Sequence, residues 1–221
     1  MNNNVIKKCA AEFLGTFALV FFGCGSMILY EINPVAISVH SIPIIFGLVI
    51  AVMIYAFSNI SGAHFNPAVS IAFCINKSIK IPDLYFYIPS QVLGAILASY
   101  SHRYFFGDSH TFGMTINRLS QSQGFMLEVL ISIFLMLTIV TIASNKKVSN
   151  TIIGFSVGGI ISVCSFVAGP FTGASMNPAR SLGPAIASGN FDSIGIYIVA
   201  PIVGTSLSIL IFNYLNQKGE S

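Results

Sequence analysis

The fold is decided by a motif that occurs twice, as Gly62-Ala63-His64-Phe65-Asn66-Pro67-Ala68-Val69-Ser70 and as Gly173-Ala174-Ser175-Met176-Asn177-Pro178-Ala179-Arg180-Ser181. Six of its nine positions are identical, and the copies lie 111 residues apart. Because proline has a fixed φ and no N–H, it fits the first turn of a helix, with Asn as the N-cap. Each copy therefore predicts a helix start. The apolar stretches that follow, Pro67–Ile75 and Pro178–Ala187, are about half as long as a membrane span.

The rest of the chain is also strongly apolar. Of its 221 residues, 54% are hydrophobic and 8% are charged, whereas about 25% of residues are charged in soluble domains. This composition excludes a soluble globular domain and a disordered chain. The net charge of +3 comes from scattered Lys and Arg rather than from a basic stripe, so no nucleic-acid partner is expected. We predict an integral membrane protein surrounded by the lipid bilayer.

Six further stretches are long and apolar enough to cross a bilayer. Turn-forming or charged residues separate them, such as Asn76-Lys77 and Gly189-Asn190. We therefore predict an all-α integral membrane fold in a single domain, residues 1–221, with six transmembrane helices plus two re-entrant half-helices. The six predicted helices are Ala11–Tyr30, Val39–Ser58, Leu84–Phe105, Gly124–Ser144, Thr151–Ala168 and Ile194–Leu215.

The two motif copies indicate an inverted repeat, with halves at about residues 10–107 and 123–215. The first helix of each half carries a carboxylate, Glu12 or Glu128, which precedes the Asn of its motif by 54 or 49 residues. Because each half contains three spans, an odd number, the second half must cross the membrane in the opposite sense. Inverted repeats of this kind place the functional site near the membrane midplane, between the halves.

An even number of spans puts both chain ends on one side of the membrane, and the basic residues indicate which side. Cytoplasmic loops carry an excess of Lys and Arg. Seven basic residues lie on the side of the termini and two lie on the other, so we expect both termini to be cytoplasmic, in a plasma (inner) membrane. The seven are Lys7, Lys8, Lys77, Lys80, Lys146, Lys147 and Lys218, and the two are Arg103 and Arg118.

The two half-helices are expected to meet at the midplane with their N-termini together. Their positive dipole ends repel a cation, and the amide donors of Asn66 and Asn177 favour the oxygen of a small neutral solute. Arg180 is the basic residue inside a half-span, and a charge there is costly unless it faces water or a partner. An aqueous pore explains it. His64 is expected either to line the cytoplasmic half of that pore or to pack within its loop.

Two interpretations of Glu12 and Glu128 remain open. In one, each carboxylate accepts hydrogen bonds from the irregular backbone of a re-entrant loop, which lipid cannot solvate. In the other, they relay protons or ions in a coupled secondary transporter. Their symmetric placement favours the structural role. The Cys and His residues show no metal-ligand spacing and no nucleophile–base pair is evident, so we expect no enzyme activity, metal or cofactor.

The paired motifs resemble those of the aquaporin (major intrinsic protein) family. The resemblance covers essentially the whole chain, from Ala11-Glu12-Phe13-Leu14-Gly15-Thr16 through Gln91-Val92-Leu93-Gly94-Ala95 to Pro201-Ile202-Val203-Gly204. It implies one pore in each subunit and a homotetramer. It also implies a channel that passes water and small uncharged solutes passively and excludes ions and protons.

The resemblance further implies a selectivity filter of four side chains, which local matching places at Phe46, Ser165, Ala174 and Arg180. Water-specific members usually have His where this chain has Ser165, so a wider constriction is expected; a shift of one residue would substitute Cys164. The run Ala179-Arg180-Ser181-Leu182-Gly183-Pro184 resembles the nodulin-26-like branch and its bacterial relatives. That branch makes glycerol, urea and metalloid hydroxides candidate solutes in addition to water.

Overall fold

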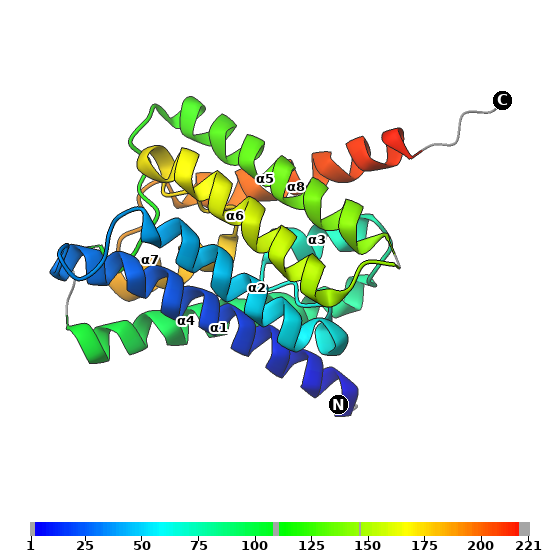
Figure 1. Ribbon diagram of the computed structural model, residues 1–221, viewed down its shortest axis with the longest axis horizontal. Helices are drawn as coiled ribbons and strands as arrows, with labels where there is room; N and C mark the ends of the chain where they lie inside the picture. Colours follow the sequence, from blue (N-terminus) through cyan, green and yellow to red (C-terminus); the bar gives the residue numbers. More distant parts are fainter. Residues whose placement is uncertain (1–2, 108–110, 146, 217–221) are drawn as a thin grey trace.

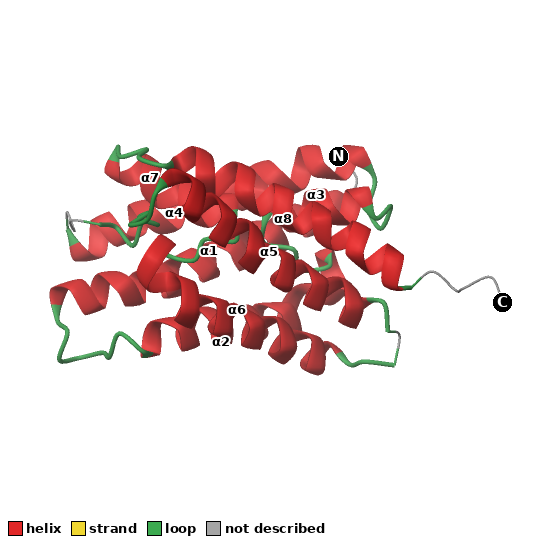
Figure 2. Cartoon of the chain, turned by 90° about the horizontal axis from the view of Figure 1, so that it is seen from above, coloured by secondary structure: helices red, strands yellow, loops and turns green. Residues whose placement is uncertain are grey.

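A computed structural model describes residues 3–107, 111–145 and 147–216, and all regular structure within these ranges is helical (Figures 1 and 2). Lys146 and Lys218, which the charge count above includes, lie outside the described residues. Six helices are long and two are short. They are α1 (Asn3–Ile32), α2 (Ser41–Ser61), α3 (Pro67–Ile75), α4 (Ile81–Phe106), α5 (Gln121–Ala143), α6 (Asn150–Thr172), α7 (Pro178–Ser188) and α8 (Ile194–Leu215).

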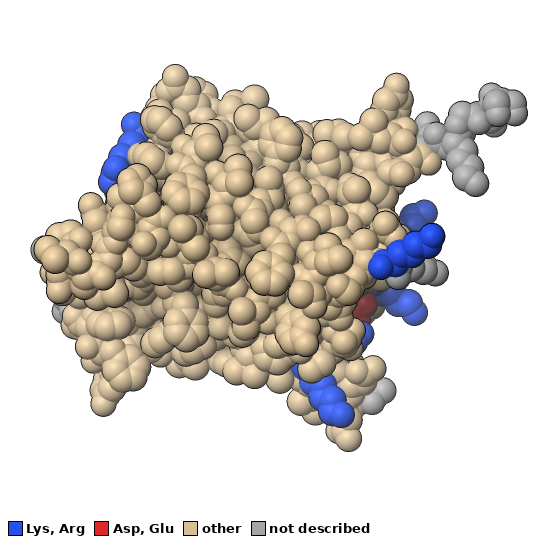
Figure 3. Space-filling view, viewed as in Figure 1, with Lys and Arg blue, Asp and Glu red and all other residues tan. Residues whose placement is uncertain are grey.

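The order of long and short helices is the same in both halves of the chain, which confirms the predicted architecture. The short helix α3 lies in the half of the bundle where α1 begins and α8 ends, and α7 lies in the opposite half (Figure 1). On the face shown in Figure 3, most of the visible Lys and Arg residues also gather at the end where α1 begins. On this face, the basic residues are therefore concentrated at one end of the bundle.

The predicted helix boundaries differ from the observed ones mainly where helices continue past the apolar stretch. Helix α1 begins at Asn3 rather than Ala11, and α6 continues to Thr172 rather than ending at Ala168. Apolar residues mark the part of a helix that lipid surrounds, whereas caps and turns decide where the helix ends. The start of α5 illustrates this, because Ser120 caps the helix ahead of the predicted Gly124 and its Oγ accepts from Gln123 N at 3.4 Å.

Five of the six long helices, all except α4, are apolar enough along one stretch to be membrane spans by composition alone. Helix α4 is less apolar, yet its 26 residues would extend about 39 Å, more than the hydrocarbon core of a bilayer. Its polar side chains Gln91, Ser99 and His102 are fully buried inside the bundle. These three polar side chains of α4 therefore face protein rather than lipid.

The helices cross closely at glycines that are equivalent in the two halves. A Cβ on Gly158 would lie 2.3 Å from the carbonyl oxygen of Gly47, and a Cβ on Gly47 would lie 2.4 Å from that of Gly158. Added Cβ atoms on Gly94 and Gly204 would each lie 2.4 Å from a backbone oxygen of α1 or α5, respectively. Small residues at such crossings let helix backbones approach one another. At the α2–α6 crossing, each helix therefore presents a glycine to the backbone of the equivalent helix in the other half.

A substitution pair in α6 tests this crossing. Gly158→Ala forces the α2 and α6 backbones apart and should destabilise the protein by about 1–3 kcal/mol, the usual range for overpacking. Gly159→Ala places its methyl group in open space, so stability should be retained or should rise by up to about 1 kcal/mol, because alanine favours a helix more than glycine does. The melting temperature of the purified protein, followed by circular dichroism, measures both. Equal melting temperatures for the two variants would contradict the crossing geometry.

Candidate functional site: a pore between two half-helices

The site is built from the N-terminal ends of α3 and α7. Asn66 and Asn177 have extended backbones with φ of −155° and −151°, and each is the N-cap of a helix whose first residue is proline. Asn66 Oδ1 accepts a hydrogen bond from Ala68 N at 2.9 Å, and Asn177 Oδ1 accepts one from Ala179 N at 3.0 Å. These bonds satisfy backbone donors that would otherwise lack partners at a helix start.

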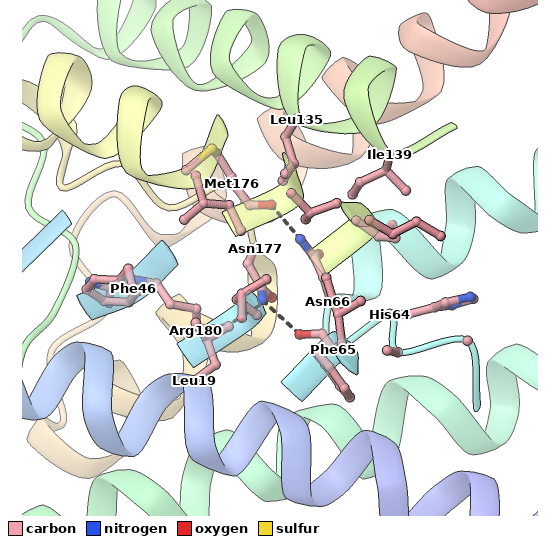
Figure 4. A pocket seen from close by; sticks show the side chains of 18 of the residues that line it. Leu19, Phe46, His64, Phe65, Asn66, Leu135, Ile139, Met176, Asn177 and Arg180 are labelled. Carbon is pink, nitrogen blue, oxygen red and sulfur yellow. Dashed lines mark hydrogen bonds between the residues drawn. The ribbon is translucent and has the colours of Figure 1, made fainter. Parts of the chain in front are cut away.

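The amide nitrogens of the same two asparagines join the halves of the protein. Asn66 Nδ2 donates to the carbonyl oxygen of Met176 at 2.7 Å, and Asn177 Nδ2 donates to that of Phe65 at 2.9 Å (Figure 4). The N-terminal ends of α3 and α7 are therefore adjacent. Each Nδ2 carries two N–H groups, and one is engaged by these bonds. Both asparagines line a cavity, so the second N–H of each can donate to a molecule inside it.

The loops that lead into the half-helices have the same unusual backbone. Ala63, Phe65, Ala174 and Met176 all have positive φ, between 46° and 54°, a region that non-glycine residues rarely adopt. Such a backbone is strained and cannot form regular helical hydrogen bonds. Its N–H groups need acceptors, because this part of the chain is buried inside a membrane protein.

Glu12 supplies the acceptors for the first loop. Its Oε1 accepts from Ser61 Oγ at 2.6 Å and from His64 N at 3.0 Å, and its Oε2 accepts from Phe65 N at 2.7 Å. Gln91 Nε2 of α4 also donates to Oε2, at 2.7 Å. The Glu12 side chain is fully buried. It therefore connects α1, the first loop and α4.

Glu128 does the same for the second loop. Its Oε1 accepts from Thr172 Oγ1 at 2.6 Å and from Ser175 N at 2.9 Å, and its Oε2 accepts from Met176 N at 3.0 Å. This carboxylate is also fully buried. Both carboxylates thus accept hydrogen bonds from loop backbone N–H groups, which is the contact that a loop-bracing role requires.

Sequence reasoning missed two tyrosines that support the same loops. Tyr87 of α4 donates through its hydroxyl group to the carbonyl oxygen of Ser61 at 2.6 Å, and Tyr197 of α8 donates to that of Thr172 at 2.8 Å. The signal was present, because the tyrosines lie 110 residues apart and Ser61 and Thr172 lie 111 apart, close to the motif spacing. Gln91 has no such counterpart, since the residue 110 positions later is Pro201.

Two cavities adjoin at the predicted filter. The inner cavity has a volume of about 250 Å³ and is lined by both asparagines, and the outer one has a volume of about 600 Å³. Phe46, Ser165 and Ala174 line both, so these side chains lie where one cavity gives way to the other. Cys164, the alternative to Ser165, lines neither of them; it is buried with its Sγ 3.9 Å from the carbonyl oxygen of Ile131.

Arg180 lies beside the Phe46 ring and lines the inner cavity, with 2% of its surface exposed. Its Nη1 donates to the carbonyl oxygen of Gly113 at 2.7 Å, and its Nη2 donates to Met27 Sδ at 3.1 Å. The guanidinium carbon is 5.0 Å from the centre of the Phe46 ring, within the range of a cation–π contact. None of these partners is a carboxylate, so the positive charge is held in place without being neutralised by its contacts.

His64 combines the two roles considered for it. It lines the inner cavity, and its Nδ1 is 3.0 Å from Ser70 Oγ. Its ring also stacks on Phe73 and makes an edge contact with Tyr87, with centroid distances of 4.7 and 5.1 Å. In Figure 4 the His64 ring points away from the paired asparagines. The His64 ring therefore packs against residues of α3 and α4 while the residue also borders the inner cavity.

Comparisons with known proteins give a consistent result. The sequence profile described as "Major intrinsic protein" matches residues 1–212. The chain is 39% identical to aquaporin NIP1-1 of Zea mays, over 95% of this chain and 75% of that protein. It is 38% identical to nodulin-26 of Glycine max, over 97% and 80%. Among solved structures, the aquaglyceroporin from Plasmodium falciparum aligns with a TM-score of 0.86 and 24% identity, over 95% of this chain and 96% of that one.

The carboxylate contacts generate a stability prediction. Glu128→Gln replaces one acceptor oxygen with an NH₂ group that faces a backbone N–H or a hydroxyl group, so a buried donor loses its partner. A loss of about 1–3 kcal/mol in the free energy of unfolding is expected. Asp192→Asn, the matching change at an exposed position, should leave stability unchanged. Thermal unfolding in detergent measures both, and wild-type stability in Glu128→Gln would contradict the bracing role.

Proposed function

The chain belongs to the major intrinsic protein family, and on that basis we propose how its pore selects solutes. Members of this family are channels rather than enzymes, and the chain is a multi-pass membrane channel for water and small solutes. The solutes that we assign to it are water and small uncharged molecules, glycerol among them, with ions and protons excluded.

The observation that carries this proposal is the pair of opposed asparagines in the inner cavity. Their bonds to Met176 and Phe65 fix both amide groups, and each keeps an N–H that can donate to a solute oxygen. A water molecule or a hydroxyl group can accept from both. Most of the other side chains that line this cavity are apolar, such as Leu19, Ile50 and Val157, so a solute finds few competing partners along the wall. This arrangement favours passage of single neutral molecules.

Two features support exclusion of cations. The positive dipole ends of α3 and α7 meet at the asparagines, and the guanidinium of Arg180 adds a full charge that its contacts leave unneutralised. Charges in a site with little water interact more strongly than charges in bulk solvent. A cation entering the pore therefore meets like charge at the filter and again at the centre.

Two small residues support a solute range wider than water. Ser165 and Ala174 line both cavities and are the two small side chains of the expected filter, beside the bulky Phe46 and Arg180. Their size leaves room for a molecule as large as glycerol, urea or a metalloid hydroxide. Phe46 then provides an apolar wall for carbon atoms, while Arg180 donates hydrogen bonds to hydroxyl groups.

The alternative is a coupled secondary transporter that uses Glu12 and Glu128. A relay carboxylate must exchange protons with a water-filled path. Neither carboxylate lines the two cavities that adjoin at Phe46, and each oxygen atom already accepts at least one hydrogen bond. These contacts favour a passive channel.

For assembly and location, we assign a homotetramer in the plasma (inner) membrane with both termini cytoplasmic. The basic end of the bundle supports this orientation, since Lys7, Lys8 and Lys147 lie on the side of the termini. Membership of the family supports the tetramer.

Stopped-flow light scattering on proteoliposomes, with water, glycerol, urea and arsenous acid gradients, tests the solute range. Water and glycerol should both permeate above protein-free vesicles. Ser165→His fills space at the filter and should lower glycerol permeability by about tenfold with a much smaller effect on water, because pore diameter limits the larger solute. Ser165→Ala, which keeps the position small, should retain both. Wild-type glycerol flux through Ser165→His would place the constriction elsewhere.

Removing the filter charge tests ion exclusion. Arg180→Val should raise proton leak at least about tenfold while water flux persists, since lowering a barrier by about 1.4 kcal/mol gives a tenfold rate change. The leak is measured with a pH-sensitive dye trapped in the vesicles. Lys147→Val removes a basic side chain from an exposed loop and should leave the leak unchanged. An Arg180→Val protein that conducts water without added leak would count against the role assigned to Arg180.

A further inference from the structure

Met27 of α1 is placed at the filter although it belongs to none of the four expected positions. Its Sδ accepts a hydrogen bond from Arg180 Nη2 at 3.1 Å, and its side chain lines the outer cavity of about 600 Å³. Phe46, Ser165 and Ala174 also border this outer cavity. Met27 therefore contacts the guanidinium of Arg180 and also faces the outer cavity, from which solutes approach.

A glycine one helical turn before Met27 helps to place the Met27 side chain at the filter. Gly23 lies four residues before Met27, so both are on the same face of α1. A Cβ on Gly23 would lie 2.3 Å from Cε1 of Phe46, which means that the absence of a side chain there lets the Phe46 ring pack against α1. The next turn then brings the Met27 thioether to the guanidinium that faces this ring.

We propose that Met27 is a fifth filter side chain, a positioning residue that holds the Arg180 guanidinium against the pore wall and so determines how readily a solute larger than water passes. This inference rests on the proposed function. Arg180 Nε is buried without a hydrogen-bond partner among the described residues, so the guanidinium is anchored by two acceptors, Gly113 O and Met27 Sδ. A thioether is a weak acceptor, but burial strengthens a hydrogen bond to a charged donor.

Loss of the thioether changes what Arg180 can do. With one remaining acceptor on Nη1, the guanidinium can rotate and direct Nη2 toward the constriction. The opening then narrows and gains a strong donor, which impedes glycerol more than water because glycerol fills more of the cross-section. Selectivity would change while the helix packing stays the same.

Three variants separate positioning from packing. Met27→Leu keeps an apolar side chain of similar size and removes the acceptor, whereas Met27→Gln keeps an acceptor on an unbranched side chain. Met126→Leu makes the same chemical change on α5, at a side chain that is 64% exposed on the outer surface of the helix. The full-length proteins are reconstituted, and the ratio of glycerol to water permeability is measured by stopped-flow light scattering, together with the melting temperature.

We expect Met27→Leu to lower the glycerol-to-water ratio by about threefold, the size of effect that one weak hydrogen bond produces. Met27→Gln and Met126→Leu should keep the wild-type ratio, and all melting temperatures should agree. An unchanged ratio in Met27→Leu would overturn the inference and leave the proposed function standing. If Met27→Leu does not reconstitute, a threefold shift in Met27→Gln overturns it instead. Absence of wild-type water flux above protein-free vesicles would overturn both.

Discussion

The structure depends on two buried carboxylates that accept hydrogen bonds from loops lacking regular secondary structure. A backbone N–H without a partner inside a membrane protein costs several kcal/mol, and water is not available to replace the missing acceptor. Glu12 and Glu128 each accept two loop N–H groups and a hydroxyl group. The chain can therefore turn back at the middle of the bundle. Such a reversal is not possible within a continuous helix or strand. Tyr87 and Tyr197 extend the same support to the carbonyl groups that precede each loop.

The functional geometry follows from this support. Once each loop is fixed, its proline begins a half-helix at the centre, and the preceding asparagine caps that helix while contacting the opposite loop. The two halves thus hold one another through the same side chains that face the pore. Arg180, three residues after Asn177, is carried to the filter by the first turn of α7. Packing and selectivity are therefore properties of the same few residues, and a change in one affects the other.

The repeated motif predicted more of the fold than of the filter. Helix α3 begins and ends as expected from Pro67–Ile75, because Pro67 marks its start and the Asn76-Lys77 pair marks its end. The partners of the carboxylates were predictable as loop backbone, since the spacing from Glu12 to Asn66 resembles that from Glu128 to Asn177. Met27 was not predictable: a methionine within an apolar helix looks the same whether it faces lipid or a cation. Gln91 was missed for a similar reason, because its role depends on the crossing of α4 with α1, a contact that no local pattern shows.

In the mechanism proposed above, the paired half-helices form a passive pore rather than a coupled pathway. The most direct measurement is the equilibrium distribution of labelled glycerol across proteoliposomes that hold an imposed pH gradient. A passive pore predicts equal glycerol concentrations inside and outside at every gradient, reached faster than in protein-free vesicles. Accumulation of glycerol that follows the size and direction of the pH gradient would contradict the account.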